Sequence, residues 1–268
     1  MRYPIYQVDA FAGEIFKGNP AAVMPLEAWL PDETMQALAA ENNLAETAFF
    51  VRETGANGAD FHIRWFTPRI EVPLCGHATL ASAWVIFNKL GWTENSIRFH
   101  SRSGPLGVQK SSNDWLILDF PNLQIEEQKT PAIILEAVEN APATAFHVPS
   151  DTNDMIVLEN EAAVRAAQPD MRILKQLGNM GLIVTAPGDQ ADFVSRYFAP
   201  GSGIDEDPVT GSIHSVLVPY WAEKLGKTKL EARQLSARGG VLRCELKGDR
   251  VAIAGQAAFY MEGTVHLE

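Results

Sequence analysis

Glu46 stands directly before an apolar run, in the segment "NLAETAFF" at residues 43–50. A carboxyl group beside an apolar wall has its charged form disfavoured, and this setting suits a carboxylic acid to proton transfer. The commoner alternative is a solvated glutamate at the edge of a strand. The residues around Glu46 leave both interpretations open.

Two short turns, "LCGHAT" at residues 74–79 and "VTGSIH" at residues 209–214, each place a glycine and a polar residue at the start of an apolar run. The first N–H groups of a helix lack partners and carry partial positive charge, so such turns could hold a carboxylate or a developing enolate. The alternative is an ordinary helix start that is capped by Thr210 or Ser212. Candidate binding residues on the two turns are Cys75, Gly76, Thr210, Gly211 and Ser212, and His77 could add a side-chain donor.

The two turns belong to a weak internal repeat. "RWFTP" at residues 64–68 recurs as "RYFAP" at residues 196–200, and "NKLG", which begins at residue 88, recurs as "EKLG" from residue 223. The second offset, 223 − 88 = 135, places Cys75 on Thr210. Several matches in one order at nearly one offset predict two halves of the same topology. Arg64 and Arg196 recur within the repeat, which favours ion pairs that serve the fold.

Each half combines short β-branched and aromatic strands with one amphipathic helix and one longer apolar helix. The longer helix of each half ends in Lys-Leu-Gly, a basic last turn followed by a glycine suited to a helix C-terminus. Mostly antiparallel sheet wrapped around a central helix, twice over, is an α+β arrangement. Glu46 falls near Gly181 in the comparison of the halves, so a carboxylate stands there in the first half only. The predicted helices are 33–43 and 76–91 in the first half, and 170–177 and 211–226 in the second.

Composition narrows the class of protein. Of 268 residues, 46% are hydrophobic and 21% charged, which predicts a folded, soluble core. The net charge of −11 and the scattered Lys and Arg residues argue against nucleic acid or an anionic membrane as a partner. Two cysteines, Cys75 and Cys244, suit a reducing cytoplasm, and their spacing relative to the histidines matches no common metal motif. His214 is expected to be a packing or surface residue.

A set of spaced motifs carries a resemblance along nearly the whole chain: "QVDAF", "F.GNPAAV", "NLAETAFF", "R.FTP..EVPLCGHATLA", "DPVTGS" and "RGG". In these motifs the chain resembles the PhzF-like family, named for the isomerase of phenazine biosynthesis, which has the diaminopimelate epimerase fold. The resemblance implies two pseudo-symmetric domains, each a central helix wrapped by strands, with the active site in a cleft between them and no cofactor. It matches the family's catalytic glutamate to Glu46, and its other site residues to His77, Asp207 and Ser212.

The resemblance favours a cofactor-independent isomerase that moves a proton within a small carboxylate. Glu46 would be the acid and base, His77 and Asp207 would orient substrate or share the proton, and no metal is implied. The relatives with the epimerase fold use two cysteines, whereas this chain has Thr210 at the second position. A racemase or dehydratase that uses Cys75 with Thr210, and a non-catalytic protein that binds small anions, remain alternatives. The predicted domains are residues 1–120 and 121–268, with the last strand a candidate to return to the first domain, and a homodimer is expected.

Overall fold

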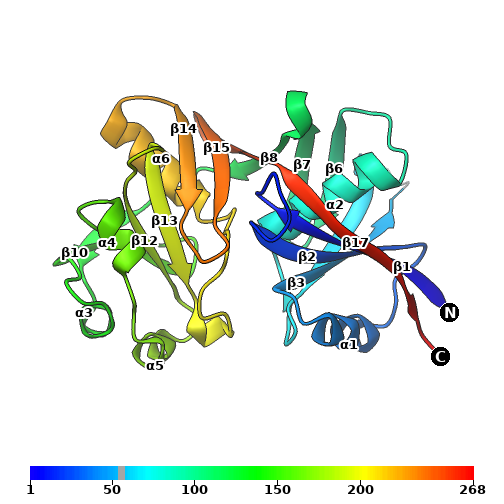
Figure 1. Ribbon diagram of the computed structural model, residues 1–268, viewed down its shortest axis with the longest axis horizontal. Coiled ribbons are helices and arrows are strands. Elements are labelled where there is room, and N and C mark those ends of the chain that lie inside the picture. The colour runs from blue at the N-terminus through cyan, green and yellow to red at the C-terminus, as the bar shows by residue number, and fades with distance from the viewer. Residues whose placement is uncertain (54–57) are drawn as a thin grey trace. The chain divides into compact units, whose positions relative to one another are not determined.

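The computed structural model describes residues 1–53 and 58–268. The chain forms two compact units (Figure 1). The first contains Met1–Phe120 together with Ile253–Glu268, and the second contains Pro121–Ala252. Within the described residues, no helix has the length and the hydropathy needed to cross a bilayer.

The first unit is built from strands and two long helices. Its helices are α1 (Asp32–Asn42) and α2 (Gly76–Lys89). Its strands are β1 (Arg2–Ala10), β2 (Asn19–Leu26), β3 (Glu46–Arg52), β4 (Phe61–Phe66), β5 (Glu71–Val72), β6 (Ser96–Ser101), β7 (Gly104–Lys110), β8 (Leu116–Pro121) and β17 (Ala257–His266). The last of these pairs antiparallel with β1 along its whole length, so the C-terminal segment belongs to the first unit.

In the part of the chain that the structure describes, the second unit has three short α-helices and one longer α-helix. Its helices are α3 (Ala132–Ala137), α4 (Glu161–Ala166), α5 (Met171–Leu174) and α6 (His214–Leu225). Its strands are β9 (Glu126–Lys129), β10 (Thr144–Val148), β11 (Asn153–Val157), β12 (Gly181–Pro187), β13 (Phe193–Phe198), β14 (Lys229–Gln234), β15 (Gly240–Lys247) and β16 (Arg250–Gly255), which runs across the boundary of the units.

The strand pairing repeats from one unit to the other. In the first unit β2 is parallel to β3, β3 antiparallel to β4, β4 parallel to β6, and β6 antiparallel to β7. In the second unit β11, β12, β13, β14 and β15 pair in the same order and with the same directions. The predicted α+β class, with two halves of one topology, is therefore confirmed.

The repeated arginines support the same correspondence. Arg64 Nε lies 2.8 Å from Glu71 Oε1, and Arg196 Nε lies 2.7 Å from Glu206 Oε1. Each guanidinium also lies over the aromatic ring two residues further along, 5.2 Å from Phe66 and 4.9 Å from Phe198. The prediction that these arginines form ion pairs within the fold is confirmed.

Helix α2 forms much of the core of the first unit. Its residues are buried without interruption from Gly76 to Ala83, and it packs against β1, β2 and β3. The hydroxyls of Thr79 and Ser82 donate to the carbonyls four residues earlier, at 2.6 and 2.7 Å, so these buried polar groups are satisfied within the helix. The helix can therefore run through the core with small polar residues on its surface.

Helix α6 begins later than the sequence predicts. The predicted helix starts at Gly211, whereas α6 starts at His214. Residues 211–213 form a turn in which the N–H of His214 donates to the carbonyl of Gly211 and that of Ser215 to Ser212, at 3.1 and 3.0 Å. In a helix that began at Gly211, the Thr210 carbonyl would accept from the N–H of His214; this carbonyl instead lies 2.9 Å from His214 Nδ1.

Candidate active site

Three polar side chains of the first unit meet at the start of α2. Glu46 opens β3, Cys75 precedes the first residue of α2, and His77 lies in its first turn. His77 Nε2 lies 3.1 Å from Glu46 Oε2, and His77 Nδ1 lies 3.4 Å from Cys75 Sγ. The exposed fractions are 8% for Glu46, 7% for Cys75 and 3% for His77, so all three are shielded from bulk water. Glu46 is therefore not a solvated glutamate at the edge of a strand, which was the alternative interpretation of its sequence context.

The Glu46 carboxylate retains some access. Its Oε2 atom is buried, yet 10% of the side chain is exposed, so the exposure lies on its other atoms. The contact between Oε2 and His77 has the distance of an ion pair without the alignment of a hydrogen bond. Catalytic contacts are often poorly aligned before substrate binds and tighten in the complex. The geometry leaves the second carboxylate oxygen as the one that could meet a ligand.

The protonation of Cys75 argues against a thiolate base. Burial raises the pKa of the Cys75 thiol to about 11, and the nearby Glu46 carboxylate acts in the same direction. His77 and the N–H of Ala78 act to lower this pKa but do not overcome burial. At neutral pH Cys75 is therefore a thiol, and the helix start does not activate it.

Opposing effects act on the pKa of His77. Burial acts to lower its pKa, whereas the Cys75 and Glu46 side chains act to raise it, and the net shift is upward. Because Cys75 is a neutral thiol near pH 7, the Glu46 carboxylate is the charge that stabilises a protonated ring there. His77 can thus share a proton with Glu46.

Glu46, Cys75 and His77 have the side-chain types of a zinc site, and one ligand atom from each lies within 4.8 Å of the others. The two short contacts of the ring involve opposite nitrogens, however, with sulfur at Nδ1 and carboxylate at Nε2. A ring offers one nitrogen to one metal ion, so these contacts fit proton sharing better than shared coordination.

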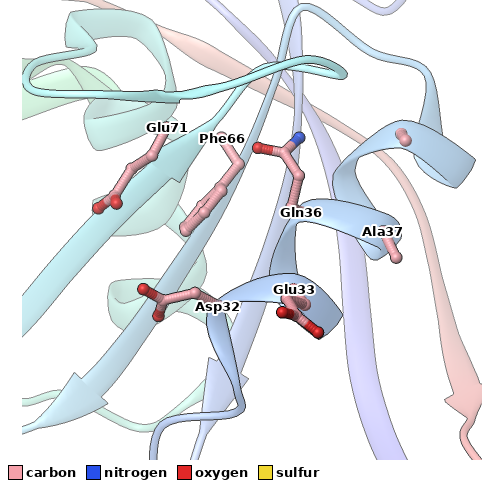
Figure 2. Close-up of a pocket in the computed structure, with 7 residues that line it drawn as sticks. Asp32, Glu33, Gln36, Ala37, Phe66 and Glu71 are labelled. Carbon is pink, nitrogen blue, oxygen red and sulfur yellow. The ribbon is translucent and has the colours of Figure 1, made fainter.

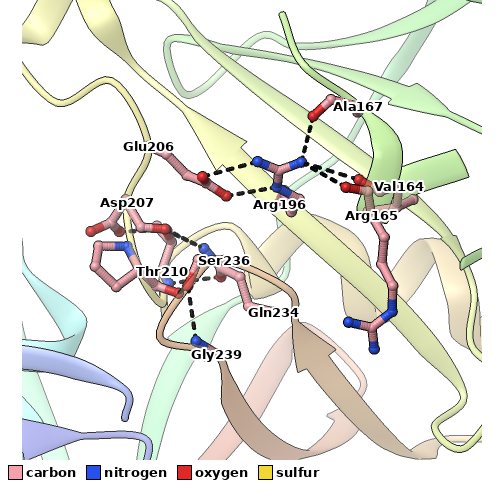
Figure 3. A network of polar contacts seen from close by, with 11 residues as sticks. Val164, Arg165, Ala167, Arg196, Glu206, Asp207, Thr210, Gln234, Ser236 and Gly239 are labelled. Atoms are coloured by element: carbon pink, nitrogen blue, oxygen red, sulfur yellow. Dashed lines mark hydrogen bonds and ion pairs between the residues drawn. The ribbon is translucent and has the colours of Figure 1, made fainter. Parts of the chain in front are cut away.

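The second unit holds a different polar cluster, around Asp207 (Figure 3). The Thr210 hydroxyl lies 2.5 Å from Asp207 Oδ2, and the Gln234 side-chain amide donates to that hydroxyl oxygen at 3.1 Å and to the Asp207 carbonyl at 2.9 Å. The N–H of Thr210 donates to Gln234 Oε1 at 2.8 Å. Because the Gln234 N–H donates to the hydroxyl oxygen, the hydroxyl proton must point to Asp207.

This network corrects one interpretation of the turn. Thr210 and Ser212 do not cap α6: Ile213 occupies the N-cap position, without a side-chain capping bond, and Thr210 bonds to Asp207 instead. A hydroxyl that donates to a carboxylate and accepts from an amide is also poorly placed to act as a base. Ser212 is partly exposed beside the buried Gly211, as a group that contacts substrate would be. Its role, and those of Gly76 and Gly211, remain predictions.

His214 is a packing residue. It is fully buried, its ring lies 5.8 Å from that of Phe193, and its Nδ1 lies 2.9 Å from the Thr210 carbonyl. Burial lowers the pKa of His214 to about 4, so the ring is neutral at physiological pH. A neutral Nδ1–H donates to that carbonyl, and His214 thus supports the turn that carries Thr210.

The position of Glu46 is occupied differently in the second unit. Thr47 pairs with Phe66 in β3 and β4, and Leu182 pairs with Phe198 in β12 and β13, so Gly181 corresponds to Glu46. A Cβ atom at Gly181 would lie 2.2 Å from the hydroxyl of Tyr197. The Tyr197 phenol, which donates to Asn153 Oδ1 at 2.8 Å, therefore fills the space of a side chain at this position.

A shallow pocket elsewhere on the first unit is bordered by carboxylates that form ion pairs (Figure 2). Asp32 and Glu71 on its border pair with Arg64, and Glu33 adds a third carboxylate. The lining residues are Asp32, Glu33, Gln36, Ala37, Ala40, Phe66 and Glu71. Asp32 and Glu71 serve ion pairs of the fold, so we place the candidate site at the cluster of Glu46 and His77.

Comparison with known proteins decides the family. The profile of the phenazine biosynthesis-like PhzC–PhzF proteins matches residues 8–263. The chain belongs to this family. It is 51% identical to an uncharacterised isomerase of Pseudomonas aeruginosa, over 268 residues and 100% of both chains. The crystal structure of a PhzF family protein from Enterococcus faecalis matches with a TM-score of 0.93 and 47% identity, over 100% of both chains. The predicted membership in a family of isomerases is confirmed.

A more distant likeness concerns the fold alone. A hydroxyproline epimerase from Agrobacterium vitis matches with a TM-score of 0.60 and 10% identity, over 98% of this chain and 92% of that one. The predicted kinship with epimerase folds is therefore confirmed at the level of architecture. This likeness carries no information on the substrate of the present chain.

Two residues of the clusters are absent from the sequence predictions. Asn19, whose Nδ2 lies 3.2 Å from His77 Nδ1, is part of the "GNP" motif but has no predicted role. Gln234 follows Leu230 and Ala232 at intervals of two in β14, and all three are buried. A polar residue on the buried side of an alternating strand is a signal that could have identified Gln234.

We expect Gln234→Leu to destabilise the second unit by about 3 kcal/mol, because the variant leaves the buried Thr210 N–H and the Asp207 carbonyl without their partner. Chemical denaturation would measure this loss. Gln36→Leu, which removes one bond to the Thr67 carbonyl, should cost about 1 kcal/mol and serves as the control. Equal stability of Gln234→Leu and wild type would show that the network contributes nothing.

Proposed function

We propose that the protein is a cofactor-independent isomerase that moves a proton within a small carboxylate-bearing metabolite, with Glu46 as the acid and base. The observation that carries the proposal is the shielded contact of Glu46 with His77, at 3.1 Å, with one carboxylate oxygen buried and the side chain still partly accessible. A carboxylate in this setting can take a proton from carbon and return it, because His77 stabilises its charge and water is largely excluded.

The other residues take supporting roles in the proposal. The N–H groups at the start of α2 can stabilise negative charge that develops on the substrate. The family resemblance assigns Asp207 and Ser212 to the same reaction, as groups that orient and hold the substrate. The network of Thr210 and Gln234 supports this assignment because it fixes the turn that carries Asp207. A cytoplasmic location and a homodimer stay predictions.

The experiment that tests the function is a substrate screen. Small carboxylates with an activated C–H bond, including amino and hydroxy acids, are incubated with the protein and followed by proton NMR. The proposal expects at least one of them to be converted to an isomer of the same mass, without added metal or cofactor. Conversion that changes the mass, or that needs an added cofactor, would contradict it.

The alternative mechanism uses Cys75 with Thr210. The variant Cys75→Ser distinguishes this mechanism from one in which Glu46 carries the proton. We expect Cys75→Ser to retain turnover within about tenfold of wild type, whereas loss of a catalytic base costs about 10²–10⁴-fold. The reason is that Cys75 is a thiol at neutral pH and the Thr210 hydroxyl is engaged with Asp207. Steady-state rates on the substrate from the screen decide the matter, and a loss of a hundredfold or more would favour the thiol mechanism.

A non-catalytic role as an anion-binding protein fits the described geometry less well. A binding protein has no need of a shielded carboxylate next to a carboxylate-binding helix start, because the negative charge of Glu46 would weaken the binding of an anion. The naming of the 51% identical relative as an isomerase also supports catalysis.

A further inference from the structure

The motif "GNP" holds Asn19 in a fixed place. Gly18 has a positive φ of 65°, and a Cβ atom there would lie 2.1 Å from the carbonyl oxygen of Ala10, so the position requires glycine. Pro20 restricts the backbone on the other side. Asn19 pairs with Ala10 at the start of β2 and is fully buried. Its side chain is therefore set by the fold rather than by solvent.

The Asn19 amide nitrogen lies 3.2 Å from His77 Nδ1. An amide nitrogen only donates, so with the amide in this orientation and the ring neutral, Nδ1 is the acceptor of this contact. The Cys75 sulfur lies 3.4 Å from the same ring nitrogen, and as a neutral thiol it is a second, weaker donor. Both neighbours of Nδ1 thus favour a ring that carries no proton on this atom.

We propose that Asn19 is a positioning residue that holds neutral His77 as the tautomer with its proton on Nε2, the nitrogen beside Glu46. A neutral imidazole has one N–H and one acceptor nitrogen, so fixing Nδ1 as acceptor decides where the proton lies. The proton on Nε2 then faces Glu46 Oε2 and leaves the other carboxylate oxygen for the substrate. This catalytic meaning rests on the proposed function, whereas the tautomer itself does not.

The same contact couples Asn19 to the charge of the ring. The titratable groups that act on His77 are Glu46 and Cys75. When the ring gains a second proton, Nδ1 becomes a donor, and Asn19 can satisfy it only by turning its amide so that the oxygen faces the ring. The amide orientation with nitrogen toward Nδ1 therefore opposes the charged ring, against the pull of the Glu46 carboxylate.

The experiment reads the ring nitrogens directly. Protein with ¹⁵N-labelled histidine is examined by two-bond ¹⁵N–¹H correlation NMR over a pH series that reaches the neutral state of His77, with His77→Gln to assign its signals. Wild type should show an unprotonated Nδ1 and a protonated Nε2. Asn19→Asp places an acceptor at Nδ1, so this atom should keep its proton at pH values at which the wild-type Nδ1 has lost it.

Two further variants complete the test. Asn19→Leu leaves only the weak thiol donor at Nδ1, so the other tautomer should become populated, and Cys75→Ala should keep the wild-type tautomer because Asn19 remains. The backbone amide spectrum reports whether each variant is folded. A neutral wild-type ring with its proton on Nδ1, or Asn19 variants in which Nδ1 stays unprotonated, would overturn the proposal.

The measurement separates this inference from the proposed function because it needs no turnover. The expected tautomer in a protein that converts no carboxylate would refute the function and leave the inference standing. Conversely, an active protein with the other tautomer would refute the role of Asn19 alone.

Discussion

Glu46→Gln is expected to leave the protein folded and to reduce turnover by at least about 10²–10⁴-fold, the contribution of one positioned acid/base group. The amide nearly preserves the shape of the side chain, so the packing of β3 is kept and the change in stability should stay within about 1 kcal/mol. Proton transfer is lost because an amide cannot take or return a proton near neutral pH. Turnover on the substrate from the screen and a thermal melt provide the two measurements.

The matched control for this variant is Glu41→Gln, which removes an exposed carboxylate from α1. It should turn over at the wild-type rate, because Glu41 is exposed, whereas the residues of the cluster around His77 are buried. If both variants keep full activity, Glu46 does not carry the proton and the proposed mechanism fails.

Gly18→Ala should destabilise the protein by about 3 kcal/mol, a loss similar to that expected for Gln234→Leu. The left-handed backbone alone costs a residue with a side chain about 1–2 kcal/mol. The added Cβ atom would also lie 2.1 Å from the Ala10 carbonyl oxygen and 2.8 Å from the Ala12 side chain. Backbone atoms cannot rotate out of the way, so β1 and β2 must separate locally, with a cost of similar size. Denaturant unfolding with a probe in the first unit measures the effect.

Gly91→Ala isolates the backbone cost. Gly91 has a positive φ of 70°, but nothing lies within 4 Å of the place that its Cβ would occupy. This variant should lose only the conformational part, about 1–2 kcal/mol. If Gly18→Ala is no less stable than Gly91→Ala, the close approach of β2 to Ala10 does not constrain the start of that strand.

The sequence predicts the parts of this fold that depend on local pattern. The apolar run from Gly76 predicts the core helix α2, and the matching "RWF" and "RYF" segments predict the repeated strand pairing. The order of the short motifs along the chain carries the resemblance to a family. This resemblance predicts that Glu46 and His77 belong to one site. The contact between them joins residues on different elements, which periodicity alone does not show.

The features that the sequence did not predict depend on tertiary contacts. The turn that carries Thr210 is bonded to Gln234, which is 24 residues away in the chain, and the ring of His77 contacts Asn19, which is 58 residues away. Helix propensity at residues 211–213 favours no particular start, and the contact of the His214 ring with the Thr210 carbonyl goes with the later one. The sequence does not show which groups an amide side chain will bond to. The only indication of a role is an amide residue at a position where the apolar pattern predicts burial.

The measurement that tests the central claim most directly is the incorporation of solvent deuterium. Wild type and Glu46→Gln are each given the substrate in deuterated water, and the substrate and product are analysed by mass spectrometry. Our account predicts that wild type forms product and places solvent deuterium at the reacting carbon whenever the proton on Glu46 exchanges during turnover, while Glu46→Gln yields neither product nor label. Product and label formed by Glu46→Gln at the wild-type rate would contradict the account, because the proton would then be carried by another group.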